Sequence, residues 1–278
     1  MSRTKTIIDP DHASSGYWKD LWNYRGLFHF LAWRDLLVRY KQTVIGVAWA
    51  VIRPLLTIVV FSFFKSFLNQ SVTAEDAVLG VAVAAIPWQL FSSALNESST
   101  SLISNANLIT KVYFPRMIVP ISTIIVCVVD FLISLVIVAG LMLYYGHIPN
   151  WHVVFLPAFV LLALIAAVGS GLFLAALNVK YRDFRYVVPF VIQLGLFVSP
   201  IAITSADVYH SNSPVILKGL YSLNPMVAVI DGFRWCLLGS EFVVNQTGLI
   251  LSLAVTVIML FVGVWYFRRM ERGFADII

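Results

Sequence analysis

The chain has 278 residues, of which 60% are hydrophobic and only 12% are charged, and its formal net charge is +5. Soluble domains carry about 25% charged residues, and one small soluble domain could not bury this much apolar surface. The mean hydropathy of +0.87 therefore predicts an integral membrane protein and excludes an ordinary soluble fold.

The N-terminal part of the chain is polar and then amphipathic. Residues 1–16 contain neither an apolar core nor a small-residue cleavage site, so we expect no cleaved signal peptide. In 27–42, aromatic and aliphatic side chains fall on one helical face and charged ones on the opposite side. This pattern predicts a helix lying in the cytoplasmic membrane interface, and a helix that contacts a soluble domain is the alternative. We expect 1–43 to form a cytoplasmic N-terminal and interface region and 44–278 a single transmembrane domain.

Six apolar stretches are long enough to cross a hydrocarbon core about 30 Å thick, which takes roughly 20 helical residues. They lie at about 44–68, 77–98, 117–145, 152–179, 186–204 and 247–267. The sequence therefore predicts an all-α membrane protein with six transmembrane helices.

The segment 213–240, between the fifth and sixth stretches, is apolar but interrupted by prolines and glycines. Its pieces, such as 225–239, are too short for a comfortable crossing. Because irregular backbone at membrane depth must be covered by protein or water, we expect a re-entrant helical hairpin here. An amphipathic loop on the surface is the alternative.

The positions of the basic residues predict the orientation. Fifteen of the 19 Lys and Arg residues precede the first stretch, follow the sixth, or lie in the connections from the second to the third and from the fourth to the fifth. The connection 146–151, on the opposite side, contains none. By the positive-inside rule both termini are cytoplasmic, as an even number of spans requires.

Arg53 in the first predicted span and Asp130 in the third are charged side chains that lie well inside their spans. Their depths from the cytoplasmic side differ by about 6 Å at a rise of about 1.5 Å per residue, so they can form an ion pair. Alternatively, Arg53 reaches the headgroups and Asp130 bonds to hydroxyl groups such as that of Ser134. The fourth span is rich in Ala, Gly and Ser over 163–176, which indicates close helix packing, within the chain rather than across a dimer.

Several motifs of catalysis are absent from the sequence. No Gly-Lys dipeptide occurs, so the chain has no phosphate-cradling Walker loop, and neither a His-Glu-x-x-His helix nor a Gly-x-Ser-x-Gly elbow is found. The five histidines are scattered, and Cys127 and Cys236 predict neither a metal site nor a disulfide. We therefore expect a transport subunit rather than an enzyme, with no cofactor of its own. An ion-driven carrier is disfavoured because buried carboxylates are few.

Six short segments carry a resemblance to a known family. They are WKDLWNYR at 18–25, WRDLLVRYKQTVIG at 33–46, NLITKVYFPR at 107–116, NVKYRDFR at 178–185, FVSPI at 197–201 and YSLNP at 221–225. In this order, and on these predicted sides of the membrane, they resemble the permeases of type-2 ABC exporters, which move O-antigen, capsule or teichoic acid chains. The resemblance covers nearly the whole chain.

The resemblance implies a homodimer in the bacterial inner membrane, resting on two copies of a separate ABC nucleotide-binding subunit. ATP and Mg would bind to that subunit. The substrate would be a polysaccharide linked to a polyprenyl diphosphate, with O-antigen favoured over capsule and teichoic acid. Membrane lipids are further partners, and no nucleic acid is expected. The alternative is an ABC permease for another lipid or a small molecule.

The resemblance also implies roles for particular residues. A short cytoplasmic segment would carry closure of the ATPase to the spans, with Tyr113 and Phe114 as buried anchors. The segment consists of Lys111, Val112, Tyr113, Phe114, Pro115 and Arg116. The basic residues Arg34, Arg39 and Lys41 would receive the lipid diphosphate, with anionic headgroups as the alternative ligand. The borders of the re-entrant helices would include Pro200, Asn224 and Pro225.

Overall fold

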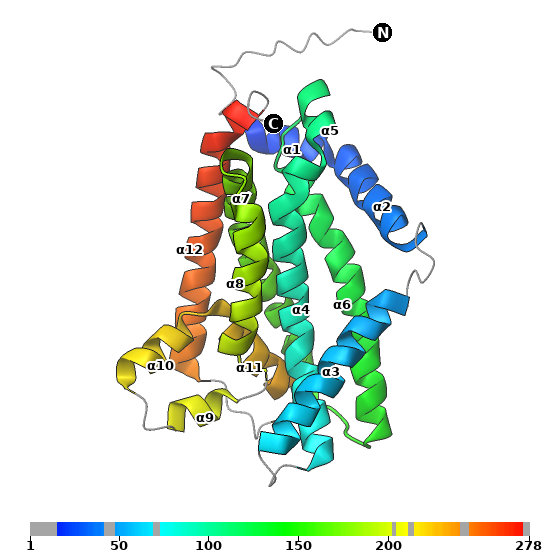
Figure 1. Ribbon diagram of the computed structural model, residues 1–278, viewed down its shortest axis with the longest axis vertical. Helices are drawn as coiled ribbons and strands as arrows, with labels where there is room; N and C mark the ends of the chain where they lie inside the picture. The colour runs from blue at the N-terminus through cyan, green and yellow to red at the C-terminus, as the bar shows by residue number, and fades with distance from the viewer. Residues whose placement is uncertain are drawn as a thin grey trace.

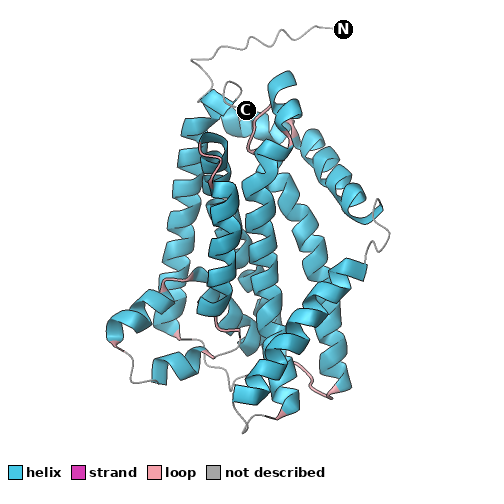
Figure 2. Cartoon of the chain, viewed as in Figure 1, coloured by secondary structure: helices cyan, strands magenta, loops and turns pink. Residues whose placement is uncertain are grey.

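The computed structural model describes residues 16–41, 48–68, 73–201, 204–210, 214–239 and 245–274. Within these ranges the chain is helical and contains no strand, and the long helices run side by side along the long axis of the molecule (Figures 1 and 2). The predicted all-α architecture is therefore confirmed.

The helices connect through short turns. In chain order they are α1 (Tyr17–Asn23), α2 (Arg25–Lys41), α3 (Ala48–Leu68), α4 (Ala74–Ser104), α5 (Ala106–Lys111), α6 (Ile118–Tyr144), the 3-10 helix η1 (Trp151–Phe155), α7 (Leu156–Lys180), α8 (Phe184–Val198), α9 (Ser205–His210), α10 (Val215–Ser222), α11 (Pro225–Leu238), α12 (Gln246–Met270) and the 3-10 helix η2 (Glu271–Gly273).

Among the described residues, five segments are long and apolar enough to cross a membrane. They are α3, α4, α6, the continuous η1–α7 segment and the α12–η2 segment. The fifth predicted span, 186–204, corresponds to α8, which has only 15 residues. The helix ends there because Ser199 precedes Pro200 and adopts extended backbone, the conformation that a following proline favours. The sixth crossing therefore stays a prediction, and residues 202–203 at its end lie outside the described ranges.

The N-terminal boundary expected at 43/44 also falls outside the described residues, since 42–47 are not described. On either side of that gap, α2 and α3 lie obliquely against the other helices (Figure 1). Only 17% of the most apolar stretch of α3 is buried, against 72% for α4. α3 is therefore a peripheral helix and α4 a central one.

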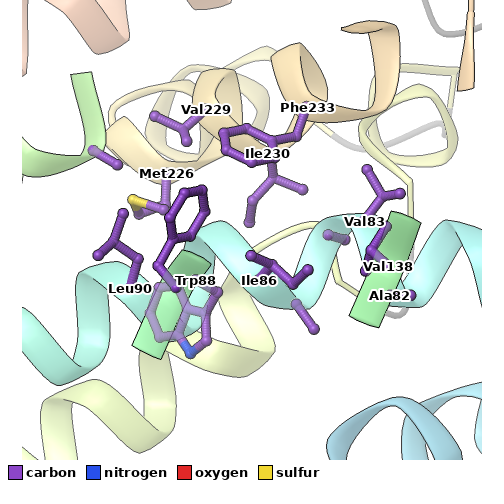
Figure 3. Packing of buried hydrophobic residues seen from close by; sticks show 14 of the residues in the cluster. Ala82, Val83, Ile86, Trp88, Leu90, Val138, Met226, Val229, Ile230 and Phe233 are labelled. Carbon is purple, nitrogen blue, oxygen red and sulfur yellow. The ribbon is translucent and has the colours of Figure 1, made fainter. Parts of the chain in front are cut away.

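The core forms where α4 meets α6, α7 and α11. On α11, Met226 and Ile230 point toward the α4 side chains Ile86 and Trp88, and Phe233 belongs to the same cluster (Figure 3). All five side chains are at most 6% exposed. Burial of each such side chain contributes about 1.5–3 kcal/mol in water, and within a membrane the same contacts act mainly through close packing.

Small residues bring α7 into direct contact with α12. A Cβ atom on Gly263 would lie 2.0 Å from the carbonyl oxygen of Gly169, and one on Gly169 would lie 2.6 Å from the backbone nitrogen of Leu260. The α7 residues Ala163 and Ala167 are fully buried. The interpretation of the small-residue stretch as intrachain packing is therefore confirmed.

Different short helices form the two ends of the helix bundle. α1, α5 and η2 gather at one end, and α9, α10 and α11 lie at the other (Figure 1). At the second end α11 begins with Pro225, and the Asn224 side chain caps it by accepting from the amide of Met226 at 3.0 Å. Helices thus end or begin at the predicted residues Pro200, Asn224 and Pro225. A membrane position for α9–α11 stays a prediction.

Candidate functional site

A cavity of about 570 Å³ opens between α2, α3, α4 and α6. We call it the arginine groove, because Arg34 and Arg39 of α2 and Arg53 of α3 line it. The facing wall, from α4, supplies the carboxylate of Glu97 and the hydroxyl of Thr100. Three cations from two helices thus share one cavity.

The amphipathic pattern of α2 explains how its arginines enter this cavity. Leu31 and Ala32 are buried, and α2 packs on α6. Phe30 and Trp33 point away from the protein, with 62% and 63% of their surface exposed. The helix therefore presents Phe30 and Trp33 outward and turns Arg34 and Arg39 toward α4 and α6.

Asp130 is the centre of the contacts between α2 and α6. Arg39 Nη2 lies 2.9 Å from Asp130 Oδ2, and the hydroxyl of Tyr40 donates a hydrogen bond to Asp130 Oδ1. Arg39 Nη1 lies 3.7 Å from Glu97 Oε1. Burial, followed by the hydrogen bond to Asp130, raises the pKa of the Tyr40 hydroxyl above its usual range, so Tyr40 keeps its proton and its role as a donor.

The Tyr40 hydroxyl fits the alternative in which Asp130 bonds to hydroxyl groups, whereas the ion pair with Arg39 belongs to neither alternative. Among the described residues, Arg53 makes no ion pair with Asp130. The Ser134 hydroxyl donates to the backbone carbonyl of Asp130 at 2.9 Å rather than to its carboxylate. Tyr40 and Asp130 are 90 positions apart, so no local pattern signals their contact.

The other two predicted basic residues differ in their surroundings. Arg34 donates to Asp35 from Nε at 2.9 Å and from Nη2 at 2.7 Å, and Nη2 also donates to Asn105 Oδ1 at 2.8 Å. Its side chain is still 37% exposed. Lys41 is exposed at the end of α2 and does not line the arginine groove. Arg53, which was predicted as an intramembrane charge and not as part of this basic set, lines the groove instead.

The predicted coupling segment, 111–116, connects α5 to the start of α6. Val112 and Tyr113 are 51% and 62% exposed, whereas Phe114 is only 4% exposed. Phe114 packs in a cluster with Leu31 of α2 and Phe267 of α12. The role of partner anchor that we expected for Phe114 does not fit this burial, because the ring already belongs to the core of its own chain.

Arg116 fixes the end of this segment to the C-terminal part of the chain. Its backbone amide donates to Glu271 Oε1 at 2.7 Å, and its guanidinium Nη1 donates to the backbone carbonyl of Glu271. Glu271 was not among the residues predicted from the sequence. An acidic residue that follows a run of arginines at the end of the last span was the only available signal.

Comparisons with known proteins extend along most of the chain. A family model described as ABC-2 type transporter matches residues 26–238. The O-antigen export system permease protein RfbA of Myxococcus xanthus is 27% identical over 93% of this chain and 97% of that protein. A protein of the same name from Klebsiella pneumoniae is 28% identical over 88% of this chain and 92% of its own length. The capsule polysaccharide export inner-membrane protein CtrC of Neisseria meningitidis serogroup B is 22% identical over 94% of this chain and 97% of its length.

Proposed function

Since the chain belongs to the ABC-2 type transporter family, we propose that it is the membrane-spanning subunit of an ATP-driven exporter for polyprenyl-diphosphate-linked polysaccharide. The observation that carries this proposal is the alignment, over nearly its whole length, with relatives named as O-antigen export permeases. Their identity of 27–28% exceeds the 22% of a relative named for capsule export, which favours O-antigen. Capsule polysaccharide is the second candidate because that relative aligns over as much of the chain.

The energy source in this proposal is a separate subunit. The sequence has no Gly-Lys dipeptide and hence no Walker loop, so ATP and Mg bind to an ABC nucleotide-binding partner. Two copies of that partner act with a homodimer of this chain. The chain itself carries no catalytic residue and no cofactor.

The proposed topology has six spans in the bacterial inner membrane and two cytoplasmic termini. α8 with the residues that follow it makes the fifth crossing, and α9–α11 form the outward re-entrant region. The gathering of α1, α5 and η2 at the end opposite α9–α11 supports this orientation, as does the distribution of Lys and Arg (Figure 1). α2 then lies in the cytoplasmic interface with Phe30 and Trp33 toward the lipid.

The arginine groove is the proposed entry site of the lipid diphosphate. A guanidinium donates to phosphate oxygens through two parallel N–H groups, and three guanidinium groups in one cavity match a ligand with two phosphates. An arriving diphosphate competes with Asp130 and Glu97 for Arg39. Lys41, outside the groove, attracts anionic headgroups.

The proposed coupling segment acts through its exposed residues. Lys111, Val112 and Tyr113 are exposed at the end that we propose to be cytoplasmic, and Tyr113 offers the large aromatic side chain typical of binding hot spots. Phe114, Pro115 and Arg116 hold the segment on the body of the permease.

The test of the proposed function is deletion of this chain in its native cell. We expect polysaccharide to disappear from the cell surface, and its lipid-linked form to accumulate on the cytoplasmic side. A plasmid copy restores export only when the ABC ATPase is present. Separate assays of lipopolysaccharide chains and capsule identify the polymer. Unchanged amounts of both polymers at the surface would refute the proposal.

A further inference from the structure

The junction between Arg116 and Glu271 connects two parts of the chain that are 155 positions apart. Glu271 accepts twice from Arg116, once with its carboxylate from the backbone amide and once with its carbonyl from the guanidinium. Because this amide lies just before α6, the carboxylate also lies near the positive end of that helix. The contact therefore holds the end of the coupling segment through both backbone and side chain.

The surroundings of Glu271 are packed rather than loose. Phe267 and Phe274, on either side of it in sequence, are fully buried and meet edge to face at 5.4 Å between ring centroids. Phe114 of the coupling segment belongs to the same apolar cluster. The Arg268 guanidinium lies 4.7 Å from the ring centroid of Tyr17, which adds α1 to the junction.

α12 connects this junction to the opposite end of the protein. The Ser252 hydroxyl lies 3.4 Å from the carbonyl oxygen of Ser222 and 3.3 Å from that of Asn224, where α10 ends and α11 begins. Along α12, Ser252 and Glu271 are separated by about 28 Å at a rise of about 1.5 Å per residue. One continuous helix thus contacts the coupling segment at one end and the helices α10 and α11 at the other.

We propose that Glu271 is a positioning residue that fixes the coupling segment to α12, so that a displacement of the segment by the ATPase moves α12 and, with it, α10 and α11. This inference rests on the proposed function, since it requires an ATPase that acts on residues 111–116. It assigns a role in coupling to the end of α12, outside the coupling segment itself.

The experiment compares Glu271→Ala with Glu271→Gln in the complete complex with the ATPase. Glutamine keeps an oxygen acceptor for the Arg116 amide, whereas alanine removes it. For Glu271→Ala we expect roughly tenfold less polysaccharide exported per ATP hydrolysed, the change expected from the loss of a hydrogen bond to a charged group, while the ATPase stays bound. Glu271→Gln should stay close to the wild type. Glu75→Ala, which removes an exposed carboxylate at the start of α4, is the matched control.

A second experiment measures the mobility of the coupling segment and does not depend on transport. A nitroxide label on Val112→Cys reports its mobility in the full chain in lipid vesicles, and the native Cys127 and Cys236 are buried, which limits their labelling. Mobility should rise with Glu271→Ala and stay unchanged with Glu271→Gln.

The outcomes separate the inference from the proposed function. Unchanged mobility in Glu271→Ala would overturn the positioning role, and raised mobility with normal export per ATP would overturn the transmission through α12. A wild-type chain that neither binds an ABC ATPase nor exports polysaccharide would overturn the proposed function and the transmission step together. The mobility result would still establish whether Glu271 holds the segment.

Discussion

Replacing Arg39 removes a guanidinium that connects α2 to both α4 and α6. Its Nη2 lies 2.9 Å from Asp130, whose side chain is 19% exposed, and its Nη1 lies 3.7 Å from Glu97, whose side chain is 44% exposed. A charge-assisted bond to a carboxylate as buried as Asp130 contributes about 1.5–3 kcal/mol. The longer contact to the exposed Glu97 contributes less than about 1 kcal/mol. We therefore expect Arg39→Ala to lower the free energy of unfolding by about 2 kcal/mol.

A double-mutant cycle with Asp130→Ala isolates the ion pair. Each single change should destabilise the purified permease, and the double change should cost clearly less than the sum of the two, with a coupling energy of about 1–2 kcal/mol. Unfolding in a detergent series measures these free energies. If the losses of unfolding free energy in the two single variants simply added up in the double variant, the pairing of Arg39 with Asp130 would be refuted.

Arg39→Lys separates the structural role from transport. Lysine keeps a charge beside Asp130 but lacks the planar fork that donates two parallel bonds to a phosphate. Stability should therefore stay near the wild-type value, while export and substrate-stimulated ATP hydrolysis fall by roughly tenfold. Full export by Arg39→Lys would contradict the proposed diphosphate contact and leave Arg39 as a bridge between helices.

Two further changes test the coupling segment and the helix packing. Tyr113→Ala should leave the permease folded but weaken its binding to the ATPase by about 2 kcal/mol, measured by co-purification. Phe114→Ala should destabilise the permease itself by about 3–5 kcal/mol. Equal stability of the two variants would argue against the burial of Phe114. Gly263→Ala drives a methyl group into the backbone of Gly169 and should cost about 2 kcal/mol or more, while Gly140→Ala, with no atom within 4 Å of the new Cβ, should be tolerated. Thermal melting of the two glycine variants provides the comparison, and equal melting temperatures would contradict the tight α7–α12 contact.

The sequence was sufficient for features that depend on local composition. Of the six predicted apolar stretches, five correspond to helices among the described residues that are long enough to span a membrane. Pro200 and Pro225 mark the places where helices end or begin. The short length of α8 was missed because apolar residues continue past Ser199, although the backbone before the proline leaves the helix.

Features that depend on how distant helices meet could not be predicted. The contact of Arg39 with Asp130 requires the tilt of α2 against α6, which periodicity within either helix does not specify. In the coupling segment, Tyr113 and Phe114 are adjacent and chemically similar, and the connecting segment has no helical period to assign one of them to the core. The pairing of Arg116 with Glu271 joins positions 155 apart and depends on α12 returning to the end where α6 begins.

The glycine contact between α7 and α12 limits how this protein can change shape. Where two backbones touch without intervening side chains, rotation or sliding of one helix past the other would drive atoms of Leu260 or Gly263 into Gly169. The two helices therefore move as one rigid body, and a displacement applied at Glu271 carries α7 along with α12. Freedom of motion is left to helices with little packing, above all α3, with 17% of its apolar stretch buried. In the proposed export cycle, the widening that a bulky polymer requires would then fall to α3 beside the arginine groove, while α7 and α12 would shift together as one unit.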